Sequence, residues 1–173
     1  MKKVIFLILI LALGYYAFFM RDDKVDVNTN DNTTGETFRP DPSNATFAFD
    51  EGPITLSQGR SESDNEEVSI LDDRAFGDIN ADGKEDSVIL LARSGGGSGV
   101  FVYAAAYVSG PVNYKGTNAV FLGDRIAPQS ISIANGAVTV RFLDRRDDEP
   151  YAAEPTVPTA KVFVYQGGEL VEK

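Results

Sequence analysis

The strongest constraint on the fold of this chain is a two-residue alternation of apolar and polar side chains that recurs from residue 44 onward. The alternating apolar positions are Phe47 and Phe49, Ile54 and Leu56, Val68 and Ile70, Ile131 and Ile133, and Val138, Val140 and Phe142. Successive side chains of an extended strand point to opposite faces, so each such segment can place one face on a core and the other in water. The pattern therefore predicts β-strands throughout residues 44–173.

Two segments, 88–92 and 100–108, are continuously apolar instead of alternating. Continuous runs indicate central strands that are covered on both faces. Turn signals separate the strands: Asn135-Gly136 and Gly167-Gly168 suit tight hairpins, and the glycine-rich stretch 95–99 suits a looser loop. The spacing predicts an all-β fold, an antiparallel sandwich or open barrel of about nine strands.

An apolar run at residues 4–20 precedes this region, and two lysines at positions 2 and 3 precede the run. As a helix, the run would span about 26 Å at ~1.5 Å per residue, close to the roughly 30 Å hydrocarbon core of a membrane. The preceding lysines favour a cytoplasmic N-terminus. We therefore expect residues 1–20 to form an uncleaved signal-anchor, a single transmembrane helix in the cell membrane, with the C-terminal domain outside the cytoplasm.

Residues 12–14 also have the small-x-small form of a signal-peptidase site, so a cleaved, secreted or periplasmic protein is the alternative. Residues 21–43 are polar and rich in Asp, Asn and Thr. Such a segment buries too little apolar surface to offset the entropy of ordering it. We expect a flexible linker at 21–43 that joins the membrane segment to an extracytoplasmic β domain at 44–173.

Charge and composition exclude several classes of function. The chain has 16 Lys+Arg, 26 Asp+Glu and a formal net charge of −10, so it lacks the basic excess of a nucleic-acid-binding protein. It contains neither Cys nor His. Thiol nucleophiles, Ser–His–Asp catalysis and most zinc sites are therefore excluded.

One segment, 78–86, carries a specific chemical pattern. Its positions 1, 3, 5, 7 and 9 hold Asp78, Asn80, Asp82, Lys84 and Asp86, and position 6 is Gly83. Calcium prefers six to eight oxygen ligands, which such a loop supplies from side chains and from the position-7 backbone carbonyl. Position 12 is Ile89 in place of the usual bidentate Glu, so we expect weak binding, with Kd on the order of 10⁻⁴–10⁻³ M. The alternative is an acidic turn whose side chains cap their own backbone.

The sequence from Phe76 to Val88 resembles the Gly-Asp-x-Asn-x-Asp-Gly-x-x-Asp segment of FG-GAP/VCBS repeats. In those repeats the loop joins two β-strands and binds calcium. Only one copy is present here, so the resemblance does not imply their propeller. The region 44–173 is also similar to uncharacterised bacterial exported or membrane-anchored β domains, through the stretches 95–99, 116–129 and 144–150. That similarity implies location and fold more than activity.

Together these features predict a membrane-tethered, calcium-stabilised β module without enzymatic activity, which binds an unknown envelope protein or glycan. One alternative is an envelope hydrolase that pairs Asp124 or Asp148 with Glu154, and another is a structural domain without metal. We also expect Asp124 and Arg125 to form a buried ion pair at a sheet edge. The aromatic side chains of Phe101, Tyr103 and Tyr107 are expected to pack on a sheet face.

Overall fold

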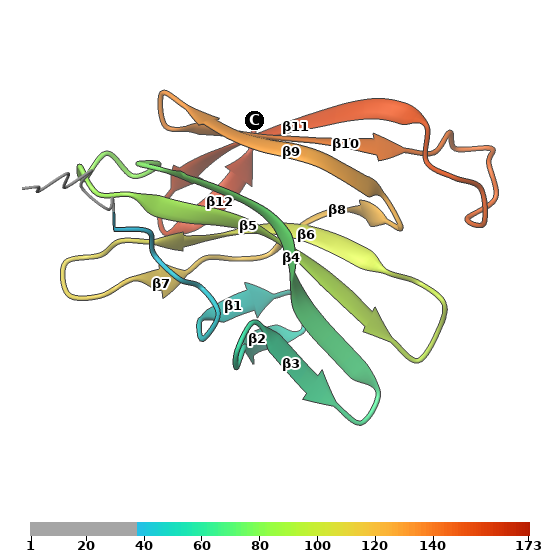
Figure 1. Cartoon of the computed structure of the whole chain (residues 1–173), viewed down its shortest axis with the longest axis horizontal. Coiled ribbons are helices and arrows are strands. Elements are labelled where there is room, and N and C mark those ends of the chain that lie inside the picture. Colours follow the sequence, from blue (N-terminus) through green and yellow to red (C-terminus); the bar gives the residue numbers. More distant parts are fainter. Residues whose placement is uncertain (1–37) are drawn as a thin grey trace, which may run out of the picture. The chain divides into compact units, whose positions relative to one another are not determined.

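The computed structural model describes residues 38–173, which form an all-β unit (Figure 1). Its strands are β1 (Thr46–Phe49), β2 (Gly52–Thr55), β3 (Arg60–Ser63), β4 (Glu66–Gly77), β5 (Asp86–Gly95), β6 (Phe101–Val108), β7 (Lys115–Gly116), β8 (Val120–Asp124), β9 (Ala127–Ala134), β10 (Ala137–Asp144), β11 (Val157–Gln166) and β12 (Glu169–Glu172). The prediction of an all-β fold is confirmed. The described residues hold more strands than the nine expected, because β3 and β7 contain no apolar residue and so give no alternation signal.

The strands form three antiparallel sheets. The largest has the order β3-β4-β5-β6-β7, and β8 pairs with β6 along the same edge as β7. A second sheet has the order β12-β11-β10-β9, and β1 pairs with β2 in a separate hairpin. Figure 1 shows the four-stranded sheet along one side of the large sheet and the β1–β2 hairpin along the other.

Two hydrophobic cores lie on opposite faces of β5 and β6. Val88 and Leu90 face a core shared with Val140 and Phe163 of the four-stranded sheet. The intervening Ile89 and Leu91 face a second core, which β1 and the segment after β2 close. Residues 88–91 of β5 are at most 1% exposed and residues 104–106 of β6 are fully buried, which confirms that these parts of the two predicted strands are covered on both faces. The start of the second predicted segment is not covered, because Val100 and Phe101 are 38% and 39% exposed. Each fully buried Leu, Ile or Val contributes about 1.5–3 kcal/mol, so these strands anchor the domain.

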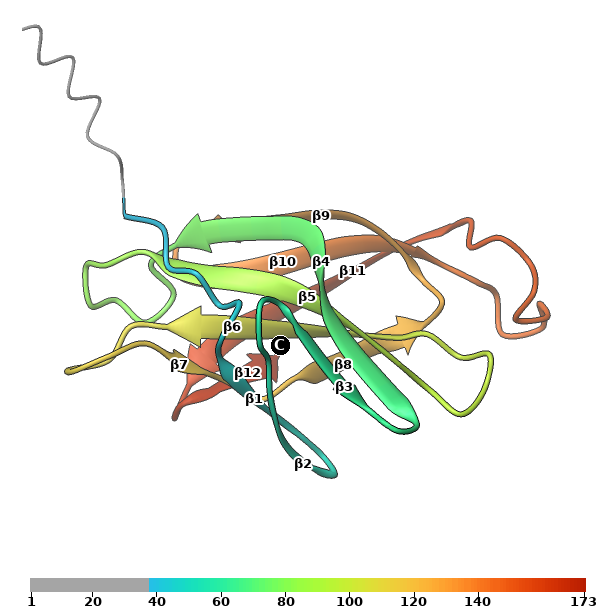
Figure 2. The same cartoon turned by 60° about the horizontal axis from the view of Figure 1, so that its bottom comes forward.

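The large sheet is strongly curved. The pairing of β4 with β5 shifts register between Ile70 and Arg74, and Figure 2 shows β4 bending sharply. Beyond the bend β4 packs against β9: a Cβ added to Gly77 would lie 3.1 Å from Cγ2 of Ile133. The bend curls the large sheet into half a barrel. The bent part of β4 ends at the loop that connects it to β5.

The tight turns agree with the sequence. Asn135 and Gly136, between β9 and β10, have φ of 51° and 73°, as a two-residue type I′ hairpin requires. Gly167 and Gly168, between β11 and β12, also have positive φ. Both hairpin predictions are confirmed.

The predicted membrane segment and most of the predicted linker lie outside the described residues. Of the linker, residues 38–43 are described; they have no regular secondary structure, and the Phe38 ring lies 5.9 Å from that of Tyr114. Within residues 38–173, no helix is long and apolar enough to cross a membrane.

Candidate functional site

Residues 78–85 form the loop between β4 and β5, as the resemblance implies, and Asp86 is the first residue of β5. Its backbone reverses through two left-handed residues, Ala81 with φ of 62° and Gly83 with φ of 83°. Glycine adopts this conformation without steric cost, and a Cβ added to Gly83 would meet no atom within 4 Å. Gly83 is therefore explained by its φ and not by close packing.

Side chains at loop positions 1, 3 and 5 fold onto the inside of the turn. The backbone N–H of Asp82 donates to both Asp78 Oδ1, at 3.3 Å, and Asn80 Oδ1, at 3.1 Å. Asp78 Oδ2 accepts from Gly83 N–H at 2.9 Å, and Asp82 Oδ1 accepts from Lys84 N–H at 2.9 Å. Because one N–H is shared by oxygens of positions 1 and 3, these oxygens already converge.

Asp86, at position 9, lies beneath the loop and is fully buried. One of its oxygens accepts from the N–H of Ile79 at 2.9 Å, and the other accepts from the N–H of Ser109 at 2.8 Å. Hydrogen bonds to a charged acceptor are stronger than those between neutral groups. Asp86 thus ties the loop to the end of β6, and as a ligand it would act from below, directly or through a water.

Ser109 was not identified from the sequence, although it completes the site. Its hydroxyl donates to Asp82 Oδ2, and its carbonyl accepts from the Asn80 side-chain amide at 2.9 Å. The available signal was topological. Once the two continuous apolar runs are taken as an antiparallel pair, the residues after the second run must lie beside the residues before the first.

Negatively charged side chains gather around the loop. Hydrogen bonds from the Ser109 hydroxyl and the Lys84 N–H lower the pKa of Asp82. The Tyr114 hydroxyl donates to the carbonyl of Glu85 at 2.9 Å. Burial and the nearby charges of Asp86, Asp82 and Glu85 raise the pKa of Tyr114, as expected where negative charge gathers. Such a field favours a cation.

The oxygen donors of the loop fit a calcium ion in part. A carboxylate oxygen has two lone pairs, so an oxygen of Asp78 or Asp82 that accepts one N–H keeps capacity for a cation. Asp78, Asn80 and Asp82 face inward, whereas Asp86 is directed at two backbone groups. Within residues 38–173, no three His, Cys, Asp or Glu side chains are grouped as a metal site. Waters would therefore complete the shell, and the same hydrogen bonds are also those of a capped acidic turn.

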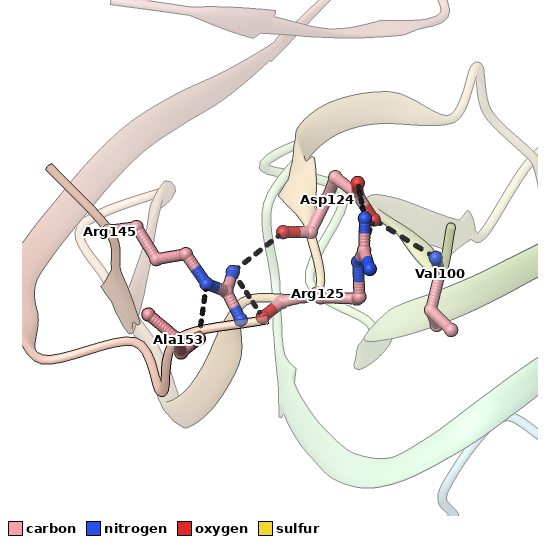
Figure 3. Close-up of polar contacts among 5 residues, drawn as sticks. All are labelled: Val100, Asp124, Arg125, Arg145 and Ala153. Carbon is pink, nitrogen blue, oxygen red and sulfur yellow. Dashed lines mark hydrogen bonds and ion pairs between the residues drawn. The ribbon is translucent and has the colours of Figure 1, made fainter. Parts of the chain in front are cut away.

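A second polar cluster lies at the end of β8 (Figure 3). Arg125 pairs with Asp124 at 2.9 Å, in a half-buried ion pair, and Asp124 Oδ1 also accepts from the N–H of Val100 at 3.0 Å. Arg145 donates to three backbone carbonyls, those of Asp124, Arg125 and Ala153. The cluster connects β8 to the loop after β10, so these contacts have a structural role.

The Asp124 carboxylate is poorly suited to the hydrolase alternative. The hydrogen bond from Arg125 lowers its pKa, which favours the ionised form and disfavours a role as general acid. Asp148 and Glu154 both lie on the exposed loop between β10 and β11.

Comparisons of the chain with family models, with curated proteins and with solved structures found no match. Its function is therefore inferred from its own residues.

Proposed function

We propose that this chain is a membrane-tethered, extracytoplasmic β module whose 78–86 loop binds calcium and whose role is to bind a partner and not to catalyse a reaction. The calcium proposal rests mainly on one observation: the N–H of Asp82 is shared by the side-chain oxygens of Asp78 and Asn80. Ligands held together before the ion arrives lose less entropy on binding it.

The ligand set favours calcium over magnesium. Two carboxylates, an amide oxygen and a backbone carbonyl form an irregular set that needs several waters. Calcium accepts irregular shells at about 2.3–2.6 Å, whereas magnesium requires a near-ideal octahedron at about 2.0–2.1 Å. With no twelfth-position carboxylate, we expect Kd on the order of 10⁻⁴–10⁻³ M, which suits extracellular calcium concentrations.

The tethering proposal rests on the sequence alone. The apolar run at 4–20 and the two lysines before it favour a β domain outside the cytoplasm, where a weak calcium site can be filled. Carbonate extraction and external protease digestion of intact cells test this placement. A soluble mature protein that begins near Tyr15 would contradict the tether.

Thermal unfolding of the full-length chain tests the calcium site. If Kd is about 10⁻⁴ M, about 10 mM calcium stabilises the folded state by RT ln(1 + [L]/Kd), about 2.7 kcal/mol. At roughly 2–4 °C per kcal/mol, the melting temperature should rise by about 5–11 °C. Asp78→Ala and Asp82→Ala should each remove most of this rise. Asp148→Asn is the matched control, because it changes the same charge on a distant exposed loop.

Screening of a negatively charged domain also raises stability, so sodium at matched ionic strength is required as a second control. We expect magnesium to have a smaller effect than calcium. If sodium reproduces the calcium effect, or if Asp82→Ala responds like the wild type, the loop is only a capped turn.

A further inference from the structure

An aromatic surface remains open at the end of the second core. Phe101 of β6 is 39% exposed and Phe121 of β8 is 47% exposed. Their ring centroids lie 6.3 Å apart, and the Tyr103 ring stands edge-on to Phe121 at 5.5 Å. Tyr103 and Tyr107 pack on the second core as the sequence predicts, but Phe101 does not. The two adjacent rings form one contiguous apolar patch with polar residues around it, which is the kind of surface at which interaction sites occur.

These rings form the floor of a groove of about 510 Å³, and its walls are acidic. Asp50 and Glu51, from the turn between β1 and β2, and Glu66, at the start of β4, line the groove beside the rings. Arg93 is the single basic residue among those that line the groove. Three carboxylates against one guanidinium leave a formal excess of two negative charges.

Arg93 already pairs with two of the three carboxylates that line the groove. Its guanidinium bonds to Glu51 at 2.6 Å and also to Glu66, and it lies 5.4 Å from the centre of the Phe49 ring. Its own side chain is only 16% exposed, so its ion pairs connect parts of the domain and it is not open to a partner. Asp50 is exposed and makes no side-chain hydrogen bond or ion pair with residues 38–173, so its charge remains available.

We propose that this groove, composed of the Phe101–Tyr103–Phe121 floor and the Asp50, Glu51 and Glu66 walls, binds an arginine-containing apolar segment of a partner protein. A guanidinium stacks on an aromatic face through cation–π attraction and reaches nearby carboxylates with its N–H groups. Apolar neighbours in the same segment would cover the remaining ring surface. The acidic walls supply the charge complementarity that selects a basic partner.

This inference specifies the partner surface of the proposed function, and it does not depend on the calcium loop. The probe is the peptide Gly-Leu-Arg-Leu-Arg-Leu-Gly-amide with a fluorophore on its N-terminus, and the corresponding Gln and Glu peptides serve for comparison. Fluorescence anisotropy is measured with the full-length chain in phosphatidylcholine nanodiscs, and empty nanodiscs give the background. Neutral lipid is chosen because a basic peptide binds anionic headgroups.

We expect the Arg peptide to bind more tightly than the Gln peptide, and the Glu peptide to bind least. Phe121→Ala should weaken Arg-peptide binding about tenfold, since it removes the most exposed ring of the floor. Asp50→Asn should weaken it about threefold, with the effect reduced at high salt. Val112→Ala is the matched control for Phe121→Ala, because Val112 is 94% exposed outside the groove, and Asp148→Asn is the control for Asp50→Asn. Unchanged circular dichroism spectra establish that the variants fold.

Three results would overturn the inference. Equal binding of the Arg and Glu peptides would remove the charge argument, and wild-type affinity in Phe121→Ala would remove the aromatic floor. Self-association that Phe121→Ala abolishes, without peptide binding, would assign this face to a second copy of the chain. Measurements in calcium and in chelator distinguish this failure from a failure of the 78–86 loop, because the groove contains none of the loop residues.

Discussion

Replacement of Asp86 by Ala should destabilise the domain more than any other change of a single acid in the loop. The substitution leaves the N–H groups of Ile79 and Ser109 without their acceptor at a fully buried position. Each unsatisfied buried group costs about 1–3 kcal/mol, so we expect a loss of about 2–6 kcal/mol. That is a large part of the ~5–15 kcal/mol by which a typical domain is stable.

Asp86→Asn is the graded variant, because its amide keeps one oxygen acceptor and turns an NH₂ group toward the other N–H. Its loss should be about half that of Asp86→Ala. Urea unfolding is followed by circular dichroism in the presence of chelator, so that any loss of calcium binding does not contribute. Asp148→Asn should change the free energy of unfolding by less than about 0.5 kcal/mol, as is usual for exposed positions. A comparably small change in Asp86→Ala would refute the anchoring role of this carboxylate.

Two further predictions concern packing and charge. Gly116→Ala should cost about 1–3 kcal/mol by urea unfolding, because the added Cβ would lie 2.1 Å from the Thr46 carbonyl oxygen, whereas Gly97→Ala, with its nearest contact at 3.8 Å, should be near neutral. Calcium should lower the raised pKa of Tyr114 toward its ordinary value, as measured by ultraviolet titration of the wild type against Tyr114→Phe. Since the folded state favours the protonated phenol, stability should fall as pH rises through the Tyr114 pKa, and less steeply with calcium. An identical titration with and without calcium would contradict a site beside this tyrosine.

The sequence predicts the central strands and the site loop well for physical reasons. An apolar run such as 88–92 requires burial on both faces, and left-handed positions such as Gly83 and Gly136 require residues that tolerate positive φ. Local requirements of this kind are visible in a single segment. Strand β3 could not be predicted from its own sequence, because it is polar throughout and is held by its pairing with β4.

Contacts between distant segments could not be predicted in the same way. The spacing of the loop suggests Asp86 as a calcium ligand, but the fold directs both of its oxygens to backbone groups, one of them at Ser109. Likewise, the apolar character of Phe101 suggests burial. In the structure Phe101 is the first residue of β6, and its ring stays 39% exposed in a groove that Asp50 and Glu51 of the β1–β2 turn also line.

The proposed calcium site at residues 78–86 and the aromatic groove lie at opposite ends of the same two strands. The loop meets Asp86, at the start of β5, and Ser109, just after β6, whereas the groove includes Arg93 and Phe101 at the other ends. Along β5, the residues from Asp86 to Arg93 span about 23 Å at ~3.3 Å per residue. That separation exceeds the Debye length of about 8 Å at physiological ionic strength, so charge added at the loop is screened at the groove.

Coupling between the two ends would therefore require a change in strand geometry. Residues 88–91 are packed against both cores, which resists such a change. We accordingly expect saturating calcium to raise the melting temperature while it changes the affinity for the Arg peptide by less than about twofold, against the 5-fold to 150-fold typical of allosteric coupling. Anisotropy titrations in calcium and in chelator, at matched ionic strength, provide the measurement. A tenfold difference in Arg-peptide affinity between calcium and chelator would show that β5 and β6 couple the loop to the groove. The packing of both cores would then not prevent a change in strand geometry.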